Sequence, residues 1–266
     1  REQHMRMVGM LGFEMNGFEL EGMPFEEYEK AWLESVKLLR SFKLISSEYY
    51  INDCLREGKK VLAEGAQGSM LDVDFGSYPF VTSSTTVTAG VCSGLGVAPT
   101  SIGKVIGITK AYCTRVGAGP FPTELFDETG KKLCELGHEF GSVTGRPRRC
   151  GWIDMVALRY ACMLDGVTDL FVMKADVMDD FEEVKMCTGY EIGGSAVNEI
   201  PFEFNTVEIK PVLRNFRGWG RSIRGVKSYA ELPEELRIFV EAIERESGVK
   251  VMAVSTSPDR EDVLFR

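Results

Sequence analysis

The alternation of short apolar, β-branched runs with amphipathic segments bounded by glycine or proline constrains the fold most strongly. Buried strands are expected within residues 104–119, 168–177 and 249–262. Helices are expected at 24–44, 46–60, 86–96, 128–137, 153–166 and 233–248. Strands that alternate with helices predict an α/β fold with a largely parallel central sheet flanked by helices.

The remaining segments give weaker patterns. Residues 61–72 predict a short buried strand that breaks into a glycine loop, and 182–192 predicts a more exposed strand. Residues 190–227 are polar and turn-rich, which suggests an antiparallel excursion, whereas 1–23 suggests loop with a short helix. Because neither a repeat nor a linker is visible, residues 1–266 are predicted to form a single domain.

Charge and cysteine usage exclude several functions. The chain has 40 Asp and Glu against 31 Lys and Arg, a net charge of −9 that disfavours a general nucleic-acid surface. It contains neither a run long enough to span a bilayer nor a basic-then-apolar leader. The seven cysteines form no C-x-x-C pair, and with two histidines they match no familiar zinc spacing. We therefore expect a cytoplasmic protein with reduced thiols, mostly in the core, and without nucleic-acid or membrane partners.

Four loops follow the predicted strands, after Leu62, Arg115, Met173 and Val254. Ligands of open α/β sheets bind at the carboxyl ends of strands, and the small residues in these loops allow close approach to the backbone. An ordinary turn has the same composition, so each loop alone is weak evidence.

The sequence MKADV suggests a site that recognises a nucleotide base. A carboxylate at Asp176 can accept two hydrogen bonds from the edge of a guanine while the stem of Lys174 covers the base. A surface ion pair is the alternative. Asp179 and Asp180, just beyond, are interpreted as solvated acids at a helix start.

Two further polar segments have two interpretations each. Gln67 lies between small residues, and its amide suits the carbonyl and ring nitrogen of a heterocycle, or simply a turn. Thr82 lies in VTSSTT, where hydroxyls and free amides before a helix could hold a phosphate or cap the helix.

An arginine-rich loop is the third candidate site. Arg146, Arg148 and Arg149 carry forked guanidinium groups that suit carboxylates and phosphates, and Pro147 restricts the backbone between them. A solvated basic loop is the alternative. His138 precedes the loop and is interpreted as structural or exposed.

Read together, the candidate segments form ordered blocks: EGAQGSMLDVDFGSYPFVTSS, KAYCTRVGAGPFPTEL, GRPRRCGWIDMVALR, MKADVMD and STSPDR. These blocks strongly resemble the adenylosuccinate synthetase family over about residues 24–266, the carboxyl-terminal two-thirds of the family's chain. The resemblance implies a fold like that of P-loop NTPases, truncated at its N-terminus. It also implies GTP-dependent ligation of IMP and L-aspartate through a 6-phosphoryl-IMP intermediate, with Mg²⁺, in a homodimer.

The resemblance also implies residue roles. Gln67 would stabilise the IMP 6-oxygen, Thr82 would hold the 5′-phosphate, and Val116 would pack at the nucleotide. The aspartate loop would comprise Ser142, Val143, Thr144, Gly145, Arg146, Pro147 and Arg148, with Arg146 also touching IMP and Arg148 reaching GTP. Guanine recognition would use Lys174, Ala175, Asp176, Ser255, Thr256 and Ser257.

The chain also departs from the family. Ser257 stands where glycine is common and could crowd the base if a positive φ is required, while Pro147 replaces a familiar arginine. The G-x-x-x-x-G-K-[ST] loop is absent, and the family's phosphate loop, catalytic Asp and His, and metal ligands are expected before Arg1. No metal ligand is therefore expected in this chain, and the alternative function is a non-catalytic nucleotide-binding fragment.

Overall fold

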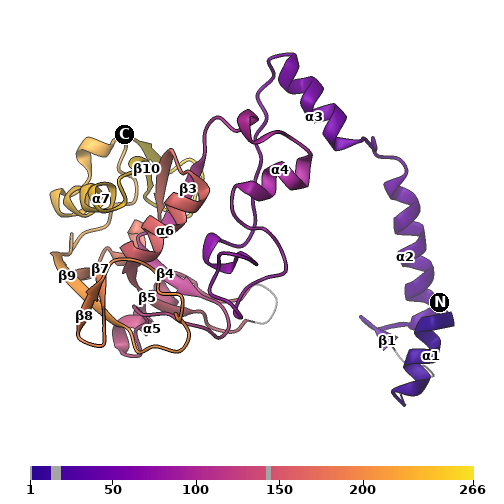
Figure 1. Ribbon diagram of the computed structural model, residues 1–266, viewed down its shortest axis with the longest axis horizontal. Coiled ribbons are helices and arrows are strands. Elements are labelled where there is room, and N and C mark those ends of the chain that lie inside the picture. Colours follow the sequence, from indigo (N-terminus) through magenta and orange to yellow (C-terminus); the bar gives the residue numbers. More distant parts are fainter. Residues whose placement is uncertain (1, 13–18, 142–144) are drawn as a thin grey trace. The chain divides into compact units, whose positions relative to one another are not determined.

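The computed structural model describes residues 2–12, 19–141 and 145–266 (Figure 1). Contacts divide the chain into two compact units, residues 1–53 and 54–266, each of which is described by itself. All of the predicted site residues belong to the second unit. Within the described ranges, no helix combines the length and apolar character needed to cross a membrane.

The first unit is mainly helical. It contains α1 (Glu2–Met10), a hairpin of β1 (Glu19–Leu20) and β2 (Met23–Pro24), and α2 (Phe25–Leu39), while α3 (Ser47–Arg56) crosses its boundary. Acidic Glu26 and Glu27 lie in the first turn of α2 and Lys37 lies in the last, as the helix dipole favours. None of residues 2–12 and 19–53 is buried.

One sheet of the second unit is mostly parallel. Its strands run in the order β11 (Val263–Phe265), β10 (Lys250–Ser255), β6 (Asp169–Met173) and β3 (Ile106–Lys110). The pairs β10–β6 and β6–β3 are parallel, and only β11 joins antiparallel. The carboxyl ends of three strands therefore meet at one edge, as the alternating pattern predicts.

The other sheet is mixed, which corrects the expectation of one largely parallel sheet. Its main order is β4 (Tyr112–Arg115), β5 (Arg149–Asp154), β7 (Glu183–Ile192) and β8 (Ser195–Val197), and β9 (Lys210–Arg217) also pairs with β7. Only β5 and β7 are parallel, because the hairpin-like return of residues 190–217 supplies antiparallel partners. The predicted antiparallel excursion is confirmed.

Helices pack against both sheets and join them through one core. In Figure 1, α6 (Met155–Asp165) lies near β7 and α7 (Glu234–Ser247), while α7 contacts β9 and β10. The fully buried Leu236, Phe239 and Ile243 of α7 share a cluster with Val172 and Met186 of the two sheets. The remaining helices are α4 (Ala89–Leu95), α5 (Glu128–Leu136), η1 (Ser69–Leu71), η2 (Pro99–Ser101), η3 (Ala175–Met178) and η4 (Tyr229–Glu231).

Three strand predictions were wrong. Residues 61–64 form no strand, and Leu62 is 90% exposed, since no described strand pairs with this segment. Residues 104–119 form two strands in different sheets, because β3 pairs with β6 whereas β4 pairs with β5. Strand β7 is largely buried rather than exposed, because it lies between β5 and β9.

Candidate active site

The carboxyl ends of the three parallel strands bring together two of the predicted loops. In the register, Lys110 of β3 lies beside Met173 of β6, and Val172 lies beside Val254 of β10. The backbone N–H of Lys174 donates to Ser255 Oγ at 3.0 Å. The segments around Lys174 and Ser255 therefore lie side by side.

Glu139 is the centre of a charged cluster at this edge. Its side chain is fully buried, and Oε1 accepts hydrogen bonds at 2.7 Å from Lys110 Nζ, Tyr112 Oη and Lys174 Nζ. Oε2 pairs with Arg148 Nη1 at 2.9 Å. One buried carboxylate thus binds three cations that come from β3, from the end of β6 and from the arginine loop.

The proton affinities in this cluster follow from the charges. Burial acts to raise the pKa of Glu139, but the hydrogen bonds from Lys110, Lys174 and Tyr112 outweigh it and lower that pKa to about 2. Burial lowers the pKa of Lys110, and the neighbouring charges of Lys174 and Arg148 act in the same direction against the attraction of Glu139. Burial and the Glu139 charge raise the pKa of Tyr112. Glu139 is therefore an anion at neutral pH.

The arginines differ in their surroundings. Arg148 binds Glu139, whereas Arg149 forms a bidentate pair with Glu124 through Nε and Nη2, with an Nε–Oε1 distance of 2.8 Å. Arg149 Nη1 also donates to the carbonyls of Gly117 and Gly119. The two side chains leave the backbone where β5 begins, and successive side chains of a strand point to opposite faces.

The rest of the predicted aspartate loop is only partly described. Arg146, Gly145 and Pro147 are exposed, and Gly145 has φ 64°. The carbonyl of Arg146 accepts a hydrogen bond from the Gly141 N–H at 2.8 Å, which closes the loop at its base. Ser142, Val143 and Thr144 lie outside the described residues.

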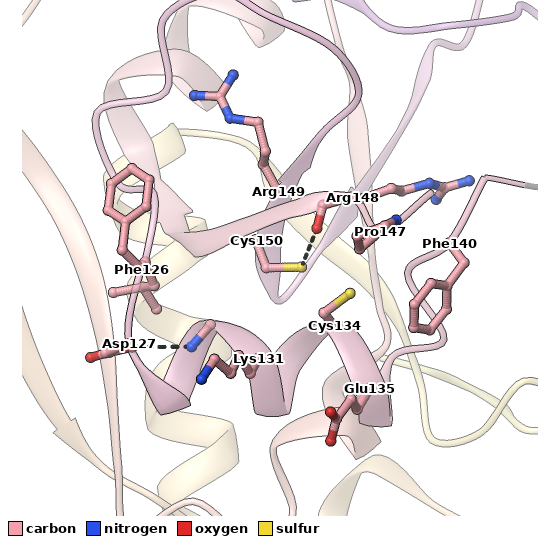
Figure 2. A pocket seen from close by; sticks show the side chains of 12 residues that line it. Phe126, Asp127, Lys131, Cys134, Glu135, Phe140, Pro147, Arg148, Arg149 and Cys150 are labelled. Atoms are coloured by element: carbon pink, nitrogen blue, oxygen red, sulfur yellow. Dashed lines mark hydrogen bonds between the residues drawn. The ribbon is translucent and has the colours of Figure 1, made fainter. Parts of the chain in front are cut away.

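A pocket of about 340 Å³ lies on the α5 side of this loop (Figure 2). Pro147 and Arg148 line it together with Phe140 and with the thiols of Cys134 and Cys150. Cys150 Sγ donates to the Arg148 carbonyl at 3.5 Å, and burial raises the pKa of the Cys150 thiol to about 12. Cys150 is therefore a protonated core thiol, as predicted for most of the cysteines.

The predicted guanine readers are largely buried. Asp176 is 8% exposed and lies in η3, directly after Ala175, which is completely buried. Lys174 adopts a left-handed φ of 60°, an unfavourable conformation for lysine that is typical of functional positions. Asp176 Oδ2 accepts a 3.3 Å hydrogen bond from Arg224 Nη2, so it does form an ion pair, as in the alternative interpretation, but with an arginine 48 positions away in the sequence.

The turn that follows β10 is stabilised by hydrogen bonds to Asp262. Ser255 and Thr256 are buried, and the N–H of Thr256 donates to the Asp262 carbonyl at 2.9 Å. Ser257 donates to Asp262 Oδ2 at 2.8 Å and does not adopt a positive φ. The serine at this position therefore carries no left-handed backbone strain.

The interpretation of Asp179 as a solvated acid was wrong. Asp179 is buried, and it accepts hydrogen bonds from Trp219 Nε1 at 3.0 Å and from the Ile223 N–H at 3.1 Å. Burial raises its pKa in spite of these bonds. Its partners lie 40 or more positions away, so no local pattern identified this contact.

Apart from Arg146, the predicted IMP residues lie on three loops. Val116 is 68% exposed, Thr82 is half-buried and Gln67 is exposed with a left-handed φ of 66°. Arg115 links two of these loops, because its Nη2 donates to Ser77 Oγ at 3.0 Å and its Nε donates to the Ala118 carbonyl. The segment that follows Gln67 is bonded to the Thr82 segment, because the N–H of Thr82 donates to the Leu71 carbonyl at 2.8 Å and the Thr86 hydroxyl donates to the Gly68 carbonyl at 2.8 Å.

The segment that contains Thr82 is organised by the buried Asp72. Its carboxylate accepts from the N–H groups of Asp74, Phe75, Thr86 and Val87. Burial opposes the charge, but these four donors outweigh it and lower the pKa of Asp72. The amides just before α4 are thus already bonded, and the N–H of Thr82 itself donates to the Leu71 carbonyl at 2.8 Å.

The arginine loop joins the two groups of candidates. Arg148 reaches the Glu139 cluster beside Lys174, and Arg149 reaches the carbonyls of the loop that follows Val116. Arg149 was named with the arginine loop but was given no ligand, and Glu139 was not among the predicted site residues. The one sequence signal for Glu139 is its position shortly before the arginine loop. Among the described residues, no three His, Cys, Asp or Glu side chains gather where they could hold a metal ion.

Fold and site together define an α/β protein that concentrates cations at the carboxyl ends of its strands, the arrangement of proteins that bind anionic ligands. The family model for adenylosuccinate synthetase matches residues 4–264. The chain belongs to the adenylosuccinate synthetase family.

Individual relatives give the same result. The chain is 54% identical over its whole length to the adenylosuccinate synthetase of Porphyromonas gingivalis, and 58% identical over 90% of its length to that of Parabacteroides distasonis. Among solved structures, fully ligated adenylosuccinate synthetase from Plasmodium falciparum superposes with a TM-score of 0.88 at 33% identity and covers 100% of this chain and 62% of that one. The chain spans about three fifths of the length of these relatives.

Proposed function

We propose that the full-length protein ligates IMP and L-aspartate into adenylosuccinate and releases GDP and phosphate from GTP. The observation that supports this most directly is the Glu139 cluster, which holds Lys174 and Arg148 beside each other in an acidic chain. Phosphoryl transfer to the 6-oxygen of IMP requires two anionic nucleotides and a carboxylate substrate to meet. Cations fixed at one point offset the repulsion between them.

Each residue then has a chemical task. Gln67 would donate its amide to the 6-oxygen as charge develops there, and Thr82 would bind the 5′-phosphate. Arg146, exposed at the loop, would hold the aspartate carboxylates so that the amine can displace phosphate from the 6-position. Arg148 would contact GTP phosphates from its place beside Glu139.

The base of GTP would bind at the ends of β6 and β10. Asp176 would accept two hydrogen bonds from the guanine edge, with Lys174 and Ala175 beside it and Ser255, Thr256 and Ser257 closing the site. In support, the N–H of Lys174 already donates to Ser255 Oγ, which fixes the two strand ends against each other. The proposal further includes Mg²⁺, whose ligands would lie outside this chain. It also includes a core like that of P-loop NTPases, assembly as a homodimer and a cytoplasmic location.

Purified full-length protein tests this function directly. GTP hydrolysis is expected only when IMP, L-aspartate and Mg²⁺ are all present, and ATP should replace GTP poorly. Asp176→Asn should reduce the preference for GTP over ATP by about fivefold to 150-fold, since a bidentate base contact contributes about 1–3 kcal/mol. GTP consumption that is independent of aspartate would refute the ligase assignment.

Arg146→Leu separates the aspartate role from the nucleotide role. This variant should raise the KM for aspartate far more than the KM for GTP, because one guanidinium fork for a carboxylate is lost. Unchanged dependence on aspartate would contradict the role of Arg146. If GDP and IMP bind to the full-length protein without any turnover, the non-catalytic nucleotide-binding alternative is correct.

A further inference from the structure

Arg224 forms an ion pair with Asp176, the carboxylate that would bind guanine in the proposed function. The side chain of Asp176 is 4% exposed, and its Oδ2 lies 3.3 Å from Arg224 Nη2. The side chain of Arg224 is 63% exposed. The pair therefore joins a buried acceptor to a donor that approaches from solvent.

The backbone beneath Arg224 is firmly held. Asp179 accepts from Trp219 Nε1 and from the Ile223 N–H, and both of these partners are buried. A Cβ on Gly218 would lie 1.7 Å from the Phe181 carbonyl oxygen, so the loop starts in close backbone contact with the end of η3. Arg224 thus extends from a fixed point, while its guanidinium can leave Asp176 without moving the loop.

The edge of guanine and the guanidinium group resemble each other as donors. Guanine presents N1–H and N2–H side by side, and arginine presents parallel N–H groups in a planar fork. Both fit a carboxylate with two acceptor oxygens. Because only 4% of the Asp176 side chain is exposed with Arg224 in place, a guanine that approaches both oxygens meets Arg224 Nη2 at Oδ2.

We propose that Arg224 is an intramolecular competitor of the guanine base, a latch that pairs with Asp176 when the nucleotide site is empty and is displaced when GTP or GDP binds. The inference rests on the proposed guanine-reading role of Asp176. The latch keeps the buried carboxylate paired between turnovers, at the cost of a modest loss in nucleotide affinity. It also shortens the time that GDP stays bound.

The test is GDP affinity of the full-length protein, measured by titration calorimetry. Arg224→Ala should tighten GDP binding about twofold to fivefold, the amount that corresponds to an exposed ion pair. Arg221→Ala is the matched control, because Arg221 is an exposed arginine of the same loop. Loss of a positive charge by itself weakens the binding of an anionic nucleotide, so the control and the latch variant should change affinity in opposite directions.

A double-mutant cycle shows whether Arg224 acts through Asp176. In an Asp176→Asn background, Arg224→Ala should no longer tighten GDP binding, because the pair is already broken. One outcome separates the two proposals: Asp176→Asn weakens GDP binding relative to wild type, and Arg224→Ala also weakens it, as Arg221→Ala does. In that case the latch is wrong, while the guanine-binding role of Asp176 stands. If Asp176→Asn binds GDP as tightly as wild type, the role of Asp176 fails, and the latch fails with it.

Discussion

At the scale of single residues, the decisive group is the buried carboxylate of Glu139. It binds Lys110, Lys174 and Arg148, three cations that would otherwise repel one another at the edge of the sheet. A buried charge is tolerated when it is paired and hydrogen-bonded, and removal of one partner leaves the others uncompensated. Glu139 therefore fixes Lys174 relative to the arginine loop.

Glu139→Gln should destabilise the protein by about 3 kcal/mol, because a neutral amide leaves three cations without their shared anion. The measurement is the midpoint of thermal unfolding of the full-length protein, which should fall by several degrees. Glu135→Gln, an exposed residue of α5, is the matched control and should leave the midpoint nearly unchanged. A similar midpoint for both variants would show that the cluster contributes nothing to stability.

The same comparison should depend on pH. The pKa of Glu139 is lowered to about 2 from its ordinary 4.5, so its stabilising charge is fully present above pH 4.5 and is lost as the pH falls toward 2. The difference in unfolding midpoint between wild type and Glu139→Gln should thus be constant near neutrality and shrink below pH 4.5. A difference that grows in acid would contradict the lowered pKa.

Single residues also show what the sequence could predict. The position of Lys174 and Asp176 beside Ser255 follows from strand ends that meet at one edge, and the structure confirms their proximity. Glu139 and Asp179 were missed because most of their partners lie far away in the sequence. Lys174 is 35 positions from Glu139, and Trp219 is 40 positions from Asp179. Such pairs depend on tertiary packing and leave no periodic signal.

At the scale of elements, strand β5 positions the end of the arginine loop. It begins at Arg149, it pairs with β4 and β7, and Asp154 at its end caps α6 by accepting from the N–H groups of Val156 and Ala157. Gly151 in its centre lies against the backbone of Thr123, where a Cβ would come within 2.3 Å of the carbonyl oxygen. Only glycine allows β5 to lie this close to the segment that contains Glu124, the partner of Arg149.

Gly151→Ala should therefore push β5 away from residues 123–125. We expect the free energy of unfolding to fall by about 1–3 kcal/mol. We also expect activity to fall, because Arg149 and Arg148 shift with the strand. Gly94→Ala on α4 is the control, since open space surrounds that position and alanine favours a helix. Thermal unfolding and steady-state kinetics check both variants, and full activity in Gly151→Ala would refute the argument.

Elements were predictable where their signals are local. The helices α2, α3, α5, α6 and α7 all fall within the predicted ranges, because turn residues, acidic first turns and closing glycines are encoded nearby. The strand predictions were wrong where pairing with another strand determines whether a segment forms a strand. Residues 61–64 have the composition of a strand but no described partner, and β3 and β4 are separate because they pair with strands of different sheets. Strand order is set by tertiary contacts rather than by composition.

At the scale of the whole molecule, the chain spans about three fifths of its relatives, and its parallel sheet has a strand at the edge with exposed apolar side chains. Ile108 of β3 is 66% exposed and Ile106 is 40% exposed. An apolar, unpaired strand edge favours pairing with other chains. We predict that in the full-length protein a segment outside this chain pairs with β3 and covers Ile108.

Ile108→Lys tests this prediction in two settings. In the 266-residue chain, the charge should reduce self-association measured by light scattering, because it blocks pairing between exposed strand edges. In the full-length protein, the same change should lower the unfolding midpoint, because it buries a charge against the covering segment. Met163→Lys on α6 introduces the same charge at an exposed apolar residue away from the strand edges, and should do neither. A full-length Ile108→Lys variant as stable as Met163→Lys would mean that β3 stays at the edge of the sheet in the complete protein.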